Sequence, residues 1–177
     1  MDRRLAHGLD SAPQPADPPA VDAVVALGAN LGDRAATLEQ ALRDLARLPL
    51  VLDVRAAAPV ESIAVTVDGP DASAPAYLNS VAVLRTRLAP SVLLAYLHAI
   101  EASHGRERRE RWGDRTLDLD LVSYGEVRSD EPGLTLPHPR AHERDFVLSP
   151  WLTVDPDAVL PGIGRVDEAL ARLRGSE

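Results

Sequence analysis

Apolar and polar residues follow one another along this chain in a way that predicts a mixed α+β fold. Runs with the composition or period of β-strands alternate with segments whose apolar residues recur at helical spacing. Strands are expected over 21–28, 50–57, 77–88 and 117–124. One helix is expected after Asn30, which can cap it, and another from Pro90, which suits a first helical turn. The resulting β-α-β-β-α-β order is that of a ferredoxin-like antiparallel sheet with both helices packed on one face.

The two ends of the chain differ from this central pattern. Residues 1–20 are rich in proline and in small or charged side chains, which predicts a disordered tail. Residues 21–177 are expected to form a single domain. Its C-terminal extension adds an irregular segment over 134–146 and a short helix over 167–173. Within the domain, residues 63–76 contain glycine and proline and are expected to form a long mobile loop.

The fourth predicted strand contains the most informative pattern in the chain. Residues 117–121 are Leu-Asp-Leu-Asp-Leu, so the leucines share one face of the strand and Asp118 and Asp120 share the other. Two carboxylates this close repel each other unless a positive group lies between them. The pair can therefore hold a divalent cation, although alternating aspartates are also typical of the solvated face of an edge strand.

The segment directly upstream is rich in arginine. Residues 106–115 are Arg-Glu-Arg-Arg-Glu-Arg-Trp-Gly-Asp-Arg. Mg²⁺ takes one or two carboxylates together with phosphate oxygens, and guanidinium groups can bind the remaining oxygens. The two neighbouring features together indicate a site for magnesium and a polyphosphate. For the arginines alone, a surface loop with internal Arg–Glu pairs is the alternative interpretation.

Composition excludes several kinds of chemistry. The 177 residues include no cysteine and no lysine, and all 19 basic residues are arginine. A disulfide framework, a thiolate zinc site, a Walker A lysine and a lysine Schiff base are therefore impossible. The net charge of −8 argues against a nucleic-acid partner, and no apolar run is long enough to span a membrane. We expect a cytoplasmic protein with a small anionic ligand.

Four motifs occur in a characteristic order and spacing. They are Ala-Leu-Gly-Ala-Asn-Leu-Gly-Asp-Arg at 26–34, Arg-Trp-Gly-Asp-Arg-Thr-Leu-Asp-Leu-Asp at 111–120, Leu-Pro-His-Pro-Arg at 136–140 and Arg-Asp-Phe-Val-Leu at 144–148. The set resembles the 6-hydroxymethyl-7,8-dihydropterin pyrophosphokinase family of folate biosynthesis, over residues 21–162. The resemblance implies a ferredoxin-like fold, two Mg²⁺ ions, and ATP and the dihydropterin as small-molecule partners. It also implies transfer of the terminal diphosphate of ATP to the pterin hydroxymethyl group, with release of AMP. We expect a monomer.

The resemblance further implies roles for individual residues. Asp118 and Asp120 match the metal-binding aspartates. The residues implied in catalysis and in nucleotide binding are Arg106, Arg108 and Arg115, and those implied in nucleotide binding alone are Thr135, His138 and Arg144. The residues implied on the pterin side are Ser62, Tyr77, Asn79, Trp112 and Phe146. Glu101 matches a helix glutamate near the site.

Some of these residues also have plainer interpretations. Phe146 is the only phenylalanine of the chain, and an isolated phenylalanine is more typical of core packing than of ligand contact. Trp112 can likewise be a core aromatic, His138 a surface residue and Glu101 part of a solvated helix end.

One segment departs from the family pattern. Where the family has Tyr-x-Thr-x-Pro followed by Gly, residues 58–65 are Ala-Pro-Val-Glu-Ser-Ile-Ala-Val, so Ser62 takes the place of the threonine. Pro139 also stands where some members have an aromatic residue. We expect these departures to affect pterin binding more than phosphate chemistry.

Two other functions fit the same residues. One is a Mg²⁺-dependent, nucleotide-using transferase that acts on a different heterocycle. The other is a non-catalytic ferredoxin-like domain that senses a nucleotide or a pterin, since such folds host many functions. The intact Asp118 and Asp120 pair argues against the sensing domain, and release of AMP with and without the dihydropterin would separate all three.

Overall fold

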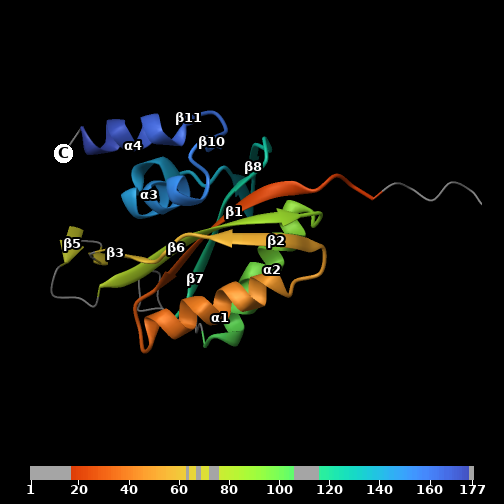
Figure 1. Ribbon diagram of the computed structural model, residues 1–177, viewed down its shortest axis with the longest axis horizontal. Helices are drawn as coiled ribbons and strands as arrows, with labels where there is room; N and C mark the ends of the chain where they lie inside the picture. The colour runs from red at the N-terminus through yellow and green to blue at the C-terminus, as the bar shows by residue number, and fades with distance from the viewer. Residues whose placement is uncertain (1–16, 63, 67–68, 72–75, 106–115, 176–177) are drawn as a thin grey trace, which may run out of the picture.

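The centre of the molecule is an antiparallel sheet of five strands (Figure 1). The computed structural model describes residues 17–62, 64–66, 69–71, 76–105 and 116–175. The strands of the sheet are β1 (Val21–Ala29), β2 (Val51–Ala56), β3 (Val60–Ser62), β6 (Tyr77–Thr86) and β7 (Asp118–Tyr124). Their order is β2-β6-β1-β7, and β3 pairs with the beginning of β6. The long predicted strands are therefore confirmed.

Helices cover both faces of this sheet, as Figure 1 shows. The helices α1 (Arg34–Ala46) and α2 (Pro90–Ser103) pack on one face, against side chains such as Val25 and Leu27 of β1. The helices α3 (Asp145–Val154) and α4 (Val166–Arg174) pack on the other face, against Val24, Val81 and Val83. The two helices predicted from the β-α-β-β-α-β pattern do lie on one face of the sheet, and the C-terminal segment adds a second helical layer on the other face.

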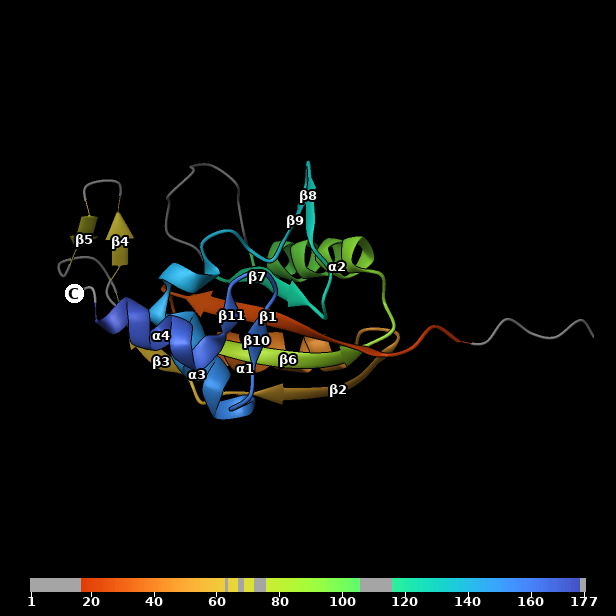
Figure 2. The same ribbon diagram turned by 90° about the horizontal axis from the view of Figure 1, so that it is seen from above.

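Short strands and turns occupy segments for which no element was expected. The strands β4 (Ala64–Thr66) and β5 (Gly69–Asp71) form a hairpin within the expected loop, and Figure 2 shows it standing away from the central sheet. The pair β8 (Ser129–Glu131) and β9 (Leu134–Leu136), the 3-10 turn η1 (Ala141–Glu143) and the pair β10 (Val159–Leu160) and β11 (Gly164–Arg165) complete the fold. The segment 134–146 is thus not irregular throughout.

The start of α1 differs from the prediction by three residues. Asp33, and not Asn30, caps the helix, because its Oδ1 accepts a hydrogen bond from the amide of Ala36 at 3.0 Å. Asn30 is buried at 5% exposure at the end of β1. Capping by an aspartate also places a negative charge at the positive end of the helix dipole.

The N-terminal part of the chain is described from residue 17. Asp17 forms an ion pair with Arg87 at 2.8 Å, so the last residues of the predicted tail contact the domain. The prediction for 1–16 concerns residues outside the described part. Within the described part, no helix has both the length and the apolar composition needed to cross a membrane.

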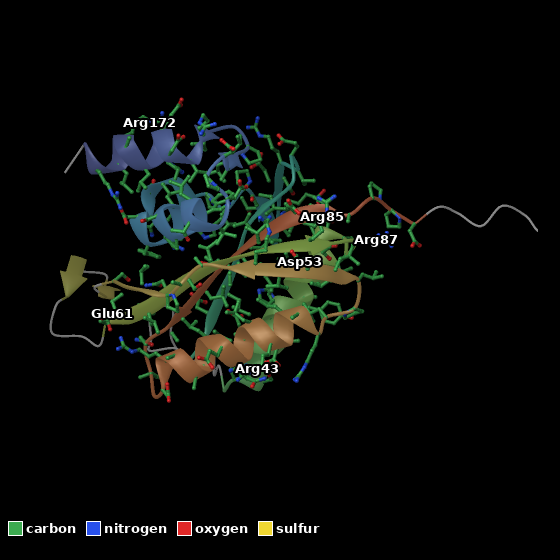
Figure 3. All side chains as sticks on the ribbon, viewed as in Figure 1. Arg43, Asp53, Glu61, Arg85, Arg87 and Arg172 are labelled. Atoms are coloured by element: carbon green, nitrogen blue, oxygen red, sulfur yellow. The ribbon has the colours of Figure 1, made fainter. Side chains whose placement is uncertain are left out.

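A hydrogen-bonded Asp–His pair joins the C-terminal ends of α1 and α2. Asp44 of α1 contacts His104, the C-cap of α2, at 3.0 Å between Oδ2 and Nε2, and Gln40 donates to the other oxygen of Asp44 at 2.9 Å. The hydrogen bond with His104 lowers the pKa of Asp44, and partial burial opposes this shift. By contrast, Figure 3 shows Arg43 of the same helix at the periphery of the molecule.

The lowered pKa of Asp44 predicts a loss of stability in acid. The stabilisation is complete above the pKa of an aspartate in the unfolded chain and disappears as the pH falls through the lower pKa of the folded state. We expect the difference in unfolding free energy between the wild type and Asp44→Asn, on the order of 1 kcal/mol, to shrink below about pH 4. Urea denaturation across this pH range measures it. A difference that stays constant down to pH 2 would contradict the assignment.

Candidate functional site

The two aspartates of β7 share one face of the sheet. Leu119 and Leu121 belong to the core under α1 and α2, so Asp118 and Asp120 face the side of α3. Both aspartates are half-buried. β7 is indeed an edge strand of the sheet, yet its aspartates face other elements of the fold.

Asp120 is paired with two basic side chains from the segment that leads into α3. Its Oδ2 accepts a hydrogen bond from the guanidinium of Arg144 at 3.0 Å, and Nε2 of His138 lies 3.9 Å from the same oxygen. Arg144 is the residue directly before α3, and its side chain is 25% exposed. A carboxylate of β7 therefore meets a guanidinium and an imidazole from the segment between β9 and α3.

The surroundings of His138 determine which of its nitrogens is protonated. Burial is the main cause that lowers the pKa of His138; Arg144 and Arg140 lower it further, and Asp120 opposes them. Nδ1 accepts a hydrogen bond from the amide of Arg140 at 3.2 Å. A neutral imidazole that accepts at Nδ1 carries its proton on Nε2, and this nitrogen is the one beside Asp120. His138 can therefore donate a hydrogen bond to an anionic oxygen at the site.

Three of the residues predicted on the pterin side lie together where β3 meets β6. Nδ2 of Asn79 donates a hydrogen bond to Oγ of Ser62 at 2.8 Å, and Ser62 pairs with Tyr77 in the sheet register. Leu78 packs into the core under α1 and α2, so Tyr77 and Asn79 face the side of α3, like the aspartates. Asn79 is buried at 6% exposure. Its amide offers both a donor and an acceptor to a heterocycle.

Phe146 lies in the first turn of α3, two residues after Arg144. It packs partly against the apolar cluster between the sheet and the C-terminal helices. The Cζ atom of Arg144 lies 5.8 Å from the centre of its ring, at the outer limit of a cation–π contact. Phe146 thus packs partly into the core and remains half-buried, which is compatible both with core packing and with contact to a ligand.

A cavity of ≈ 290 Å³ lies beside Asp120 and His138. It is lined by Leu94 and His98 of α2, by Leu119 and Leu121 of β7, and by Gly133, Leu134, Thr135, Leu136 and Pro139. Thr135, predicted as a nucleotide contact, is part of this wall, and Figure 2 shows the β8–β9 hairpin beside α2. A second hollow of ≈ 520 Å³ borders α1 and contains none of the predicted site residues. We therefore place the site at the smaller cavity.

Glu101 is buried at 1% exposure on α2. Its Oε1 accepts a hydrogen bond at 2.9 Å from the backbone amide of Leu119, the residue between the two aspartates of β7. The interpretation of Glu101 as part of a solvated helix end was therefore wrong. Leu94, His98 and Glu101 stand at positions i, i+4 and i+7, which a helix places on one face. This spacing is the sequence signal that could have identified the α2 wall of the cavity.

Four predicted residues lie outside the described part of the chain: Arg106, Arg108, Trp112 and Arg115. Among the residues described, no three histidine, aspartate or glutamate side chains cluster as a complete set of metal ligands. The protein donors available are the carboxylates of Asp118 and Asp120. Such a pair fits Mg²⁺, which commonly takes one or two carboxylates and completes its shell with phosphate oxygens and water.

Comparison with known proteins identifies relatives over most of the chain. Residues 24–156 match the family described as 7,8-dihydro-6-hydroxymethylpterin-pyrophosphokinase (HPPK). A Synechocystis protein named 2-amino-4-hydroxy-6-hydroxymethyldihydropteridine pyrophosphokinase is 41% identical over 143 residues, which cover 81% of this chain and 71% of the relative. A Pseudomonas aeruginosa protein of the same name is 42% identical over 147 residues, which cover 83% of this chain and 88% of the relative.

Solved structures share the fold at low sequence identity. A structure titled as HPPK-DHPS in complex with substrates has a TM-score of 0.67 and 11% identity, and the match covers 89% of this chain. Plasmodium falciparum HPPK-DHPS with pteroate has a TM-score of 0.64, 11% identity and coverage of 90% of this chain. The chain spans less than half of those solved chains, 44% and 43% respectively.

The contact of Glu101 with Leu119 predicts a dependence of β7 on α2. Glu101→Ala leaves the buried amide of Leu119 without its acceptor and opens a cavity, so we expect a loss of about 2–3 kcal/mol in unfolding free energy. Glu101→Gln keeps a side-chain oxygen in place and should lose less than half of that amount. Urea denaturation of both variants measures the difference, and equal losses would show that the charge, not the acceptor, is what matters.

Proposed function

Because the chain belongs to the 7,8-dihydro-6-hydroxymethylpterin pyrophosphokinase family, we propose that it transfers diphosphate from ATP to 6-hydroxymethyl-7,8-dihydropterin in folate biosynthesis. In this reaction the hydroxymethyl oxygen attacks the β-phosphorus of ATP. The bond between that phosphorus and the oxygen bridging to the α-phosphorus breaks, AMP leaves, and the hydroxyl group loses its proton.

The observation that carries this proposal is the meeting of Asp120 with His138 and Arg144 beside a cavity, with Asp118 two residues away on the same face of β7. The cavity walls contributed by α2 and β9 combine leucine side chains with His98 and Thr135, so a nucleoside would find both apolar and polar contacts there. The guanidinium of Arg144 and the Nε2–H of His138, both beside Asp120, are donors suited to phosphate oxygens. We propose that Thr135 contacts the nucleotide from the β9 side.

The same geometry supports a place for the pterin. Ser62, Tyr77 and Asn79 lie on the same face of the sheet as the aspartates. Only β1 separates Tyr77 and Asn79 from β7, and Ser62 lies one strand further away, on β3. We propose that Asn79 recognises the edge of the heterocycle and that Phe146 stacks on its ring. The two substrates would then meet over β1, with the hydroxymethyl group directed towards the phosphates.

We propose that Asp118 and Asp120 hold Mg²⁺, with two ions as the resemblance implies. When bound, such ions neutralise charge that develops on the reacting phosphate oxygens. The residues of this chain would act mainly by position and charge: the arginines and His138 orient the polyphosphate, and Asn79 and Phe146 orient the acceptor.

Several finer points remain part of the proposal. Arg106, Arg108 and Arg115 are proposed to contact the phosphates during the reaction, and Trp112 to lie beside the pterin. The strand order β2-β6-β1-β7, with α1 and α2 between its strands in sequence, supports the ferredoxin-like topology. Cytoplasmic location, the monomeric state and the disorder of residues 1–16 stay predictions.

The function is tested by AMP release from ATP in the presence of Mg²⁺. We expect the wild type to release AMP when the dihydropterin is present and to release none without it. Asp118→Ala and Asp120→Ala should each reduce this rate by at least about a hundredfold, because each removes a carboxylate that binds the cation. The melting temperature of Asp118→Ala should change little, since its side chain is half-buried on an edge strand, whereas that of Asp120→Ala should fall modestly because Asp120 also pairs with Arg144.

Asp130→Ala is the matched control, because Asp130 is an exposed aspartate of β8 that does not line the cavity. Its rate should equal that of the wild type. AMP release that does not depend on the dihydropterin would indicate a transferase acting on another acceptor, and binding without AMP release would indicate a sensing domain.

The role of Phe146 is tested by a pair of substitutions. Phe146→Leu keeps an apolar side chain in the core but removes the aromatic ring. We expect it to weaken dihydropterin binding by about 1–3 kcal/mol with ATP binding and melting temperature nearly unchanged, because stacking alone is lost. Calorimetry with each ligand measures this. If Phe146→Leu binds the dihydropterin normally and only Phe146→Ala is impaired, with a lower melting temperature, Phe146 acts by core packing.

A further inference from the structure

Gly28 occupies a central position between the two halves of the proposed site. It lies near the end of β1, opposite Asn79 of β6 on one side and opposite Asp118 of β7 on the other. Residues directly opposite each other in an antiparallel sheet present their side chains on the same face. A side chain at position 28 would therefore stand between those of Asn79 and Asp118.

The backbone does not require glycine at this position. Gly28 is not among the glycines with positive φ, which are Gly32, Gly105, Gly125, Gly133, Gly162 and Gly164 in the described part of the chain. Glycine within a strand is less stable than alanine and often marks a site where a ligand or another backbone approaches closely. The glycine at position 28 is therefore explained by the limited room for a side chain, not by the backbone conformation.

The space around Gly28 is limited by Asn79. A Cβ atom built on Gly28 would lie 3.3 Å from Oδ1 of Asn79 and 3.8 Å from Cδ1 of Tyr77. The first distance is tighter than about nine in ten real Cβ contacts, so Asn79 would have to move by a few tenths of an ångström. Such a movement of Asn79 would cost free energy, because its Nδ2 is hydrogen-bonded to Ser62 at 2.8 Å and the residue is buried.

We infer that Gly28 is a specificity-determining position for the pterin: its missing side chain leaves the acceptor oxygen of Asn79 open and keeps a passage from Asn79 to Asp118. The two residues are separated by two strand spacings, about 10 Å. The pterin ring itself would extend from Asn79 over the backbone of Gly28 and direct its hydroxymethyl group towards the side of Asp118. This inference rests on the proposed function, because it assigns Asn79 to the acceptor and Asp118 to the phosphate side.

Gly28→Ala is the test, with 6-hydroxymethyl-7,8-dihydropterin and a non-hydrolysable ATP analogue as the probes. We expect the Kd of the dihydropterin, measured by calorimetry with the ATP analogue bound, to rise at least about tenfold. The Kd of the ATP analogue alone should change less than about twofold, because the cavity beside α2 does not include position 28. The melting temperature should change little, since the preference for alanine over glycine in a strand offsets the cost of displacing Asn79.

A second variant shows whether the effect passes through Asn79. Asn79→Ala removes the atom that the new methyl group would displace. In that background Gly28→Ala should cost much less dihydropterin affinity than it does in the wild type, a non-additivity expected of residues in contact. Independent, additive losses would contradict the route through Asn79.

The outcomes separate this inference from the function on which it rests. Unchanged dihydropterin affinity in Gly28→Ala, with a wild type that binds and reacts, would overturn the inference alone. A lower melting temperature together with equal weakening of both ligands would also overturn it, because that result assigns Gly28 to packing. A wild type that fails to bind the dihydropterin would overturn both.

Discussion

The pairing of β1 with β6 on one side and with β7 on the other is the constraint on which this site depends. The register places Asn79, Gly28 and Asp118 side by side across three strands. A slip of one residue in either pairing would turn the polar side chains of that strand into the core and its leucines towards the site. Burial of the leucines on the α1 and α2 face therefore fixes the register, and the register keeps the polar side chains on the face of the site.

Charge compensation then connects the sheet to the second helical layer. The ion pair between Asp120 and Arg144 joins β7 to the start of α3, where Phe146 also lies. Helices cover both faces of the central strands, so Asn79 is buried and the aspartates are half-buried. In such surroundings electrostatic interactions are stronger than in water, which suits the binding of a polyphosphate.

Local periodicity was enough to predict the long strands, α1, α2 and α4, and the shared face of Asp118 and Asp120. It was not enough for α3, because Pro150 lies inside that helix and proline normally ends one. The short pairs β4–β5 and β8–β9 have too few residues to show a period. The cavity walls, such as Leu94 and Leu134, come from segments that only the tertiary structure brings together. The burial of Glu101 depends on how α2 packs on β7, which no local pattern contains.

The position of α4 has a consequence for the architecture of larger relatives. This helix lies beyond residues 24–156, which match the family, yet its Val166 and Leu170 pack in the same cluster as Val147 and Leu148 of α3. Arg174 also pairs with Asp145, between Arg144 and Phe146, at 2.6 Å. A protein domain joined after α4 would therefore be attached to the element that supports one wall of the site.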